Sequence, residues 1–99
     1  MRWPFARPDG RHVYHLFVVR VGDKSEAMRA HLSARGVGNG VYYPVPLHLQ
    51  KCFAYLGYTR GDFPMAEAAA AETIALPMYP ELSDAQLEFV VSAVTDFFR

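Results

Sequence analysis

The chain is organised around residues 37–67, VGNGVYYPVPLHLQKCFAYLGYTRGDFPMAE, which combine flexible and rigid backbone in one stretch. Four of the seven glycines and three of the seven prolines lie here. Pro44 and Pro46 each lack an amide hydrogen and fix φ, so no strand or helix interior can pass through them. We therefore expect a short strand over residues 41–43, followed by a rigid corner that leads to His48. Fixed corners rich in tyrosine are typical of a surface that contacts a ligand or partner.

Upstream of this stretch, residues 12–21 carry apolar side chains at alternate positions, which predicts a strand. Asp23 with Glu26 three residues later has the spacing of a capping box, so a helix is predicted to begin there. Gly36 is placed to end this helix in the left-handed conformation, with the following valine packed back against it. Residues 1–10 contain two prolines and a glycine and are predicted to be an irregular lead-in.

Downstream, the apolar positions of residues 49–56 follow helical spacing, which predicts a short helix closed by Gly57. Cys52 falls on the apolar side of this helix and is expected to be a small core residue. Pro64 is suited to a first helical turn and is predicted to open an alanine-rich helix with Glu67 and Glu72 on its outside.

Two more elements complete the prediction. Residues 73–78 alternate apolar side chains and are interrupted by Pro77, which indicates a short strand that lies at an edge or ends there. Ser83 with Gln86 forms a second capping-box spacing at the start of an amphipathic last helix. The order of strands and helices predicts an α/β sandwich, with a two- to three-stranded sheet and helices packed on one face.

Composition limits the class of protein. Ninety-nine residues correspond to one domain. The 52% hydrophobic content without a long apolar run indicates a non-membrane protein with an exposed apolar surface. Ten basic and ten acidic residues give no net charge and no basic block, so nucleic acid is not expected as a partner. The single cysteine excludes an internal disulfide, and a cytoplasmic location is expected.

The candidate site residues lie in the corner. His48 is held by the rigid backbone around it and is a candidate functional residue. Tyr42 and Tyr43 are adjacent on the predicted strand, so one is expected to face the core and the other to present its hydroxyl outward. His15 is expected to be partly buried and hydrogen-bonded, and His31 to be solvated. No metal-ligand spacing, phosphate-binding glycine pattern or pair of catalytic carboxylates is found, so no catalytic or metal residue is predicted.

Five blocks of the sequence, in order, resemble one family. They are RHVYHLFVVR at residues 11–20, GVGNGVYYPVPLHLQ at 36–50, LGY at 56–58, GDFPMAE at 61–67 and LPMYPEL at 76–82. Together they are similar to the C-terminal part of the DegT/DnrJ/EryC1/StrS family, the pyridoxal-phosphate-dependent nucleotide-sugar aminotransferases. The resemblance spans about residues 11–98.

The resemblance implies a fold, an activity and partners. Residues 11–99 would be the small C-terminal domain of the aspartate aminotransferase (type I) fold, and the large domain that binds pyridoxal 5'-phosphate would lie outside this chain. The family transfers an amino group from an amino acid, typically glutamate, to a keto-sugar nucleotide and works as dimers. Neither lysine of this chain, Lys24 or Lys51, lies in the family's lysine motif, so this chain alone is expected to bind no cofactor and to be inactive.

The resemblance implies a functional role for three residues only. The family's corner borders the sugar-nucleotide cleft, so Tyr42, Tyr43 and His48 correspond to substrate contacts that give orientation and specificity. Two alternatives stay open: a stand-alone, non-catalytic module that dimerises or binds a partner, or an independent small enzyme with His48 as general base.

Overall fold

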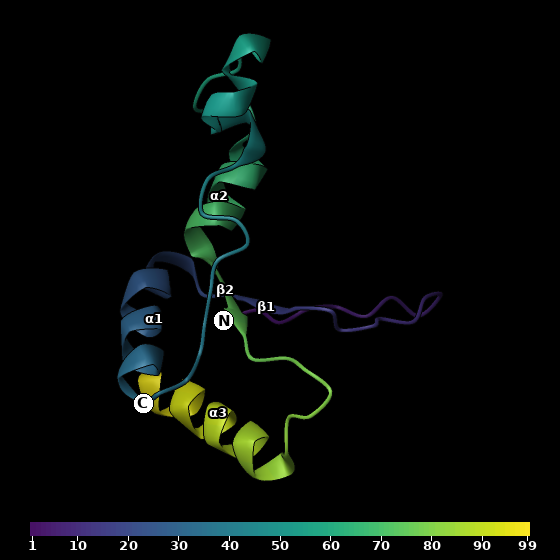
Figure 1. Cartoon of the computed structure of the whole chain (residues 1–99), viewed down its shortest axis with the longest axis vertical. Coiled ribbons are helices and arrows are strands. Elements are labelled where there is room, and N and C mark those ends of the chain that lie inside the picture. The colour runs from purple at the N-terminus through teal and green to yellow at the C-terminus, as the bar shows by residue number, and fades with distance from the viewer.

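A small antiparallel sheet forms the centre of the computed structural model, which describes residues 1–99 (Figure 1). Strand β1 (Phe17–Arg20) pairs with β2 (Thr73–Leu76) so that Phe17 lies opposite Leu76 and Arg20 opposite Thr73. The helices are α1 (Ser25–Ala34), α2 (Pro64–Glu72) and α3 (Asp84–Phe97), with short 3₁₀ helices η1 (Gly22–Lys24), η2 (Leu47–Leu49) and η3 (Lys51–Leu56). The predicted α/β class with a small sheet is confirmed.

Single residues extend both edges of the sheet. Arg2 pairs with Arg20 through two backbone hydrogen bonds of 2.8 Å, and Gly40 pairs with Ala75 on the opposite edge. The strand predicted over residues 41–43 is wrong, because only Gly40 bonds to β2 before the chain turns away toward Pro44.

The predicted strand over residues 12–21 is too long, since β1 begins only at Phe17. Val13 is 81% exposed and Tyr14 has a positive φ of 49°, so the alternating pattern there does not face a core. The predicted irregular lead-in therefore continues to Leu16, and this segment projects away from the rest of the molecule (Figure 1).

Helix α1 begins differently from the prediction. The chain leaves β1 through the 3₁₀ turn η1, so α1 starts at Ser25 and no side chain caps it. The predicted capping box of Asp23 and Glu26 therefore does not form. The end of the helix agrees with the prediction: Gly36 has a φ of 73°, and the amide of Val37 donates to the carbonyl of Leu32 at 2.9 Å.

Helix α3 begins as predicted. The Ser83 Oγ accepts from the amide of Gln86 at 3.3 Å, while the Gln86 Oε1 accepts from the amide of Ser83 at 3.0 Å. These reciprocal bonds satisfy two amides that a helix start leaves open and so fix where α3 begins.

The core lies between one face of the sheet and the two helices α1 and α3. Met28, Leu32 and Ile74 are fully buried, and Val19 is buried beside them. Phe17 and Leu76 lie on the same face as Val19 and Ile74, and both pack partly against the cluster. The predicted packing of helices on one face is confirmed.

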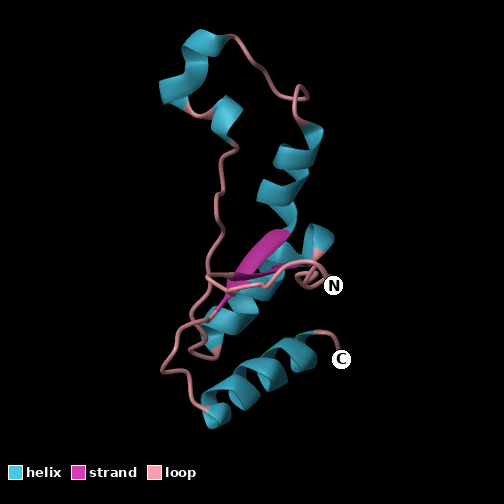
Figure 2. Cartoon of the chain, turned by 90° about the vertical axis from the view of Figure 1, so that its right-hand side faces the viewer, coloured by secondary structure: helices cyan, strands magenta, loops and turns pink.

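The part of the chain between Gly40 and Glu72 forms an arm that extends away from this core. Helix α2 runs directly into β2, and η2 and η3 lie at the far end of the molecule from α3 (Figure 2). The arm makes the molecule long, with extents of 48 × 35 × 22 Å and a radius of gyration of 15.5 Å. A compact domain of 100 residues has a radius of gyration of about 13 Å.

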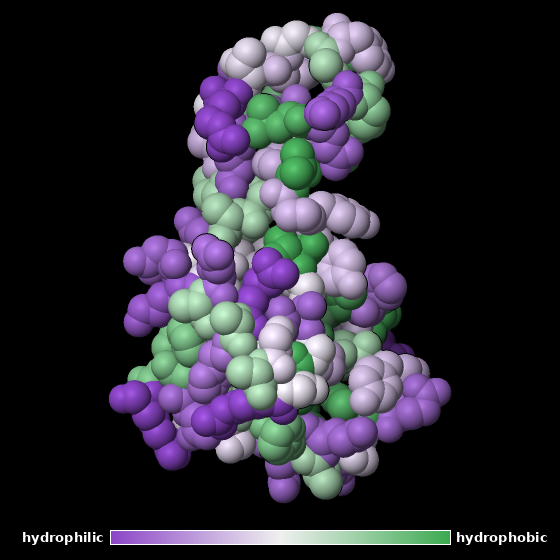
Figure 3. All heavy atoms as spheres, turned by 60° about the vertical axis from the view of Figure 1, so that its left-hand side comes forward, coloured by the Kyte–Doolittle hydropathy of each residue, from purple (hydrophilic) through white to green (hydrophobic).

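Because the shape is open, few side chains are fully enclosed. Only 12 of 99 residues are buried, and apolar residues reach the surface over both the arm and the body (Figure 3). No helix is long and apolar enough to cross a lipid bilayer.

Candidate functional site

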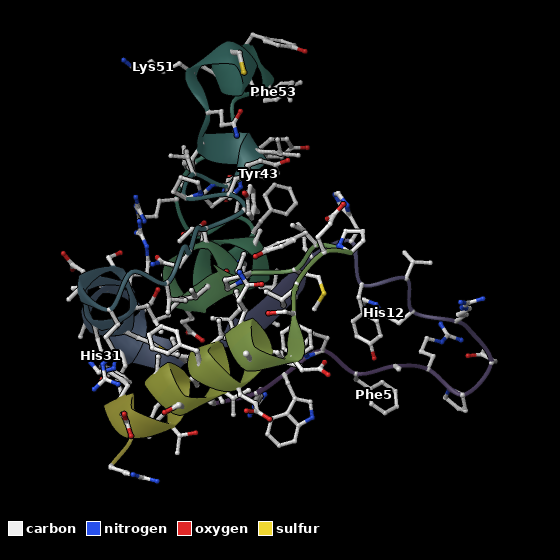
Figure 4. The ribbon with its side chains drawn as sticks, turned by 60° about the horizontal axis from the view of Figure 1, so that its bottom comes forward. Phe5, His12, His31, Tyr43, Lys51 and Phe53 are labelled. Atoms are coloured by element: carbon white, nitrogen blue, oxygen red, sulfur yellow. The ribbon has the colours of Figure 1, made fainter.

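The corner that the sequence singles out lies on the arm, where the chain passes from the sheet edge into η2. Tyr42 is 53% and Tyr43 68% exposed, and their rings meet edge to face with 5.7 Å between centroids. The expectation that one of them faces the core is wrong, because no regular strand forms there to alternate the side chains. Figure 4 shows the Tyr43 ring on the arm, outside the core. Both tyrosine side chains are therefore exposed at the surface of the arm.

His48 takes the opposite position and is buried. Its side chain is 6% exposed, its Nε2 lies 3.0 Å from Oε1 of Glu67, and its ring meets Phe63 edge to face at 4.9 Å. Residues 46–50 hold it there, because the amide of Leu49 donates to the carbonyl of Pro46 and closes the 3₁₀ turn of η2. The rigid corner predicted around His48 is present, but the imidazole faces α2.

Glu67 is the residue that sequence reasoning missed. It was expected on the outside of α2, yet its side chain is 16% exposed. Oε1 accepts from the amide of Gly61 at 2.6 Å and also contacts His48. The Gly61 amide is the first cause, and His48 a further one, that lowers the pKa of the Glu67 carboxyl below its ordinary value. The signal available in the sequence was a carboxylate in the first turns of a helix that follows a glycine turn, where backbone amides are open.

A cavity of about 410 Å³ opens beside His48 on the arm. Its walls come from η2, η3, the turn after η3 and α2, and they are mainly apolar and aromatic: Leu47, His48, Phe53, Leu56, Tyr58, Phe63 and Ala66. Tyr58 and Phe63 stack edge to face across 4.9 Å between centroids. Such a ring-lined hollow with a single imidazole offers flat surfaces for stacking and one polar contact.

Three other sequence expectations are corrected. His15 is exposed rather than partly buried, because the strand begins after it. His31 is half-buried rather than solvated: its Nε2 lies 3.0 Å from the carbonyl oxygen of Ala93, and its ring meets Phe97. Cys52 is exposed, because residues 51–56 form the 3₁₀ helix η3 and its side chain lies away from the core.

The residues present do not fit pyridoxal phosphate. That cofactor needs a lysine amine for its Schiff base inside a site that also grips its phosphate and ring. Lys51 is exposed at the outer end of the arm (Figure 4), and Lys24 is exposed with its Nζ 5.7 Å from the Phe98 ring. No group of three or more histidine, cysteine or acidic side chains is placed to hold a metal ion.

The profile of the DegT/DnrJ/EryC1/StrS aminotransferase family matches residues 3–95. The chain belongs to this family.

Curated relatives agree with that assignment. The chain is 47% identical over 92% of its length to a pleiotropic regulatory protein of Geobacillus stearothermophilus, covering 24% of that protein. It is 37% identical over 95% of its length to a dTDP-3-amino-3,4,6-trideoxy-alpha-D-glucose transaminase of Streptomyces venezuelae, covering 24% of it. The chain thus spans about a quarter of the length of the relatives it matches.

A solved structure shows the same fold. The S. venezuelae protein DesV, determined in complex with a ketimine intermediate, superposes with a TM-score of 0.92 at 36% identity. The match covers 97% of this chain and 26% of DesV. The aminotransferase fold expected from the sequence is therefore confirmed.

Proposed function

We propose that this chain is the small-domain portion, residues 11–99, of a pyridoxal-phosphate-dependent aminotransferase that acts on a keto-sugar nucleotide with an amino acid, typically glutamate, as donor. The observation that carries the proposal is the superposition of 97% of the chain on a protein determined with a ketimine intermediate. The transaminase name of a relative at 37% identity gives the substrate class. We expect the cofactor chemistry to lie in the remaining three quarters of such an enzyme, since Lys24 and Lys51 are both exposed.

Within that enzyme the corner would form the substrate side of the cleft. Tyr42 and Tyr43 are two exposed tyrosines in one short segment, and their hydroxyl groups suit the orientation of a polyhydroxylated sugar. His48, which lines the ring-lined cavity, would supply a further contact to the sugar. None of the three residues would act on the amino group itself. Their loss is therefore expected to weaken binding of the sugar nucleotide more than binding of the amino donor.

The partners proposed are the rest of the aminotransferase and a second copy of it. The chain leaves many large apolar side chains open to solvent, and its radius of gyration is larger than that of a compact domain of this size. Covering this surface with protein would stabilise the fold through burial of apolar area. A single exposed cysteine fits a reducing compartment, so we place the enzyme in the cytoplasm.

A chimera tests the proposal. The corresponding quarter of the S. venezuelae transaminase is replaced by this chain, and transamination of that enzyme's own sugar nucleotide is followed. The expected result is measurable activity that falls when Tyr42 and Tyr43 are replaced by Phe, with the His15→Gln chimera as matched control. A chimera that binds pyridoxal phosphate normally but forms no amino sugar contradicts the proposal.

A stand-alone dimerisation module is the second candidate, and one observation favours it. An apolar groove of about 300 Å³ opens between the lead-in, the sheet and α3, where Trp3, Leu87 and Val91 are exposed. Sedimentation equilibrium of the purified chain measures this directly. A dimer that Val91→Asp dissociates would support the module, and a monomer at all concentrations would exclude self-association through this groove.

A further inference from the structure

The hydrogen bond between His48 and Glu67 decides which imidazole nitrogen carries hydrogen. The amide of Gly61 holds the pKa of Glu67 below its ordinary value, so the carboxyl is ionised near neutral pH and can only accept hydrogen bonds. Nε2 of His48 must therefore donate to Oε1 across the observed 3.0 Å. In the neutral ring the hydrogen is then on Nε2, and Nδ1 is left as an acceptor.

Nδ1 of His48 is not fully enclosed by the chain. The protein makes no hydrogen bond to it, and no buried side-chain nitrogen or oxygen in the structure lacks a partner, so this atom still reaches solvent. The imidazole plane cannot turn freely, because Phe63 packs against it and Glu67 holds its other nitrogen. The ring so held belongs to the lining of the ring-lined cavity.

The same carboxylate also fastens the arm. Oε1 of Glu67 accepts a hydrogen bond from the Gly61 amide and also contacts Nε2 of His48. These two contacts link η2 and the turn over residues 59–62 to α2. That turn is closed on its own by Asp62, whose Oδ2 accepts from the Thr59 amide at 2.7 Å. Apart from this carboxylate, the bonds at the end of the arm are local, so the placement of His48 against α2 depends on Glu67.

We propose that Glu67 is a positioning residue that holds His48 with hydrogen on Nε2, so that Nδ1 accepts a hydrogen bond from a hydroxyl group of the bound sugar. The inference rests on the proposed function for its ligand, but the arrangement of Glu67 and His48 does not. A sugar hydroxyl is the class of donor that suits an imidazole nitrogen of fixed direction beside apolar rings. An analogue that lacks that hydroxyl would leave Nδ1 unpaired and bind more weakly.

The arrangement is tested in the 99-residue chain by long-range ¹H–¹⁵N correlation of its histidine rings at neutral pH, with His48→Gln used to assign the signal. The expected spectrum shows His48 protonated at Nε2 with a slowly exchanging ring hydrogen. Glu67→Gln retains an acceptor oxygen and should keep this signal, whereas Glu67→Ala should lose the slow exchange. Protonation at Nδ1 in the unaltered chain, or the same spectrum in Glu67→Ala, overturns the proposal.

The role of His48 in sugar recognition is tested by steady-state kinetics of the complete enzyme loaded with pyridoxal phosphate (the holoenzyme). This measurement can also be made for variants that do not fold as the isolated chain. Loss of one hydrogen bond to the sugar should raise the sugar KM roughly 10-fold in His48→Gln and Glu67→Ala, with kcat and the amino-donor KM little changed. Glu67→Gln should restore most of the affinity, and His15→Gln should match the unaltered enzyme. An unchanged sugar KM in His48→Gln overturns the recognition step.

The two tests separate this inference from the proposed function. A holoenzyme with no sugar transaminase activity in any variant contradicts the proposed function, while the ring spectrum still reports whether Glu67 positions His48. An active holoenzyme with a Nδ1-protonated His48 contradicts the positioning role and leaves the proposed function in place.

Discussion

Replacing Ile74 by alanine should strongly destabilise the chain, because this side chain is fully buried at the centre of the sheet. Ile74 lies opposite Val19 in the strand ladder and belongs to the same cluster as Met28 and Leu32. Since β2 is bonded to β1 on one edge and to Gly40 on the other, its backbone cannot move in to fill the space. Removal of three carbons at such a site costs about 3 kcal/mol, from lost burial plus the cavity left behind.

The measurement is urea unfolding of the 99-residue chain, followed by circular dichroism. With few residues buried, the free energy of unfolding is expected near the low end for its length, about 5 kcal/mol. A denaturant slope of about 1.5 kcal/mol per molar converts the loss into a midpoint about 2 M lower. Val13→Ala, at a position 81% exposed, is the matched control and should change the free energy by less than about 0.5 kcal/mol. Equal midpoints for the two variants would refute this account of the core.

Two further predictions concern helix ends and pH. Ser83→Ala removes the acceptor that caps α3 and should lower the free energy of unfolding by about 1 kcal/mol in the same urea assay; no change would mean that the capping box contributes nothing. Hydrogen bonds from Arg20 to Glu72 and from Arg35 to Asp96 lower the pKa of each carboxyl in the folded chain. Because these folded pKa values lie below the unfolded ones, the added stability is full above about pH 5 and is lost as the pH falls through about 4 and below. Thermal unfolding between pH 3 and pH 7 checks this, and a midpoint that rises on acidification would contradict it.

Local signals in the sequence predicted the elements that local chemistry controls. The capping box of Ser83 and Gln86, the left-handed cap at Gly36 and the helix opened by Pro64 all form as expected. Each depends on residues within a few positions of one another, so no knowledge of the distant chain is needed.

The sequence-based predictions were wrong where contacts with distant parts of the chain determine the local structure. Apolar alternation before Phe17 predicts a strand, yet no partner strand lies beside residues 12–16 and their side chains stay exposed. Cys52 follows an apolar helical spacing, but residues 51–56 form a 3₁₀ helix and its side chain is exposed. In both places an apolar pattern without a covering partner in this chain produces exposed surface.

The candidate site was found by sequence only in part. The corner of Tyr42, Tyr43 and His48 came from prolines and from the family resemblance, and its contact with a substrate stays a prediction. The partner of His48 could not be foreseen, because Glu67 is 19 residues away and meets it only through the fold of the arm. A carboxylate in a predicted helix gives no signal of which distant side chain it will bind.

In the proposed function, this chain shapes an aminotransferase cleft but does not hold the cofactor. The most direct measurement adds pyridoxal phosphate to the purified 99-residue chain, records the absorbance spectrum, reduces with borohydride and weighs the intact protein. We expect no internal-aldimine band and no specific adduct, because Lys24 and Lys51 are both exposed and lack a surrounding site. A single adduct on either lysine, formed with an aldimine band, would contradict it.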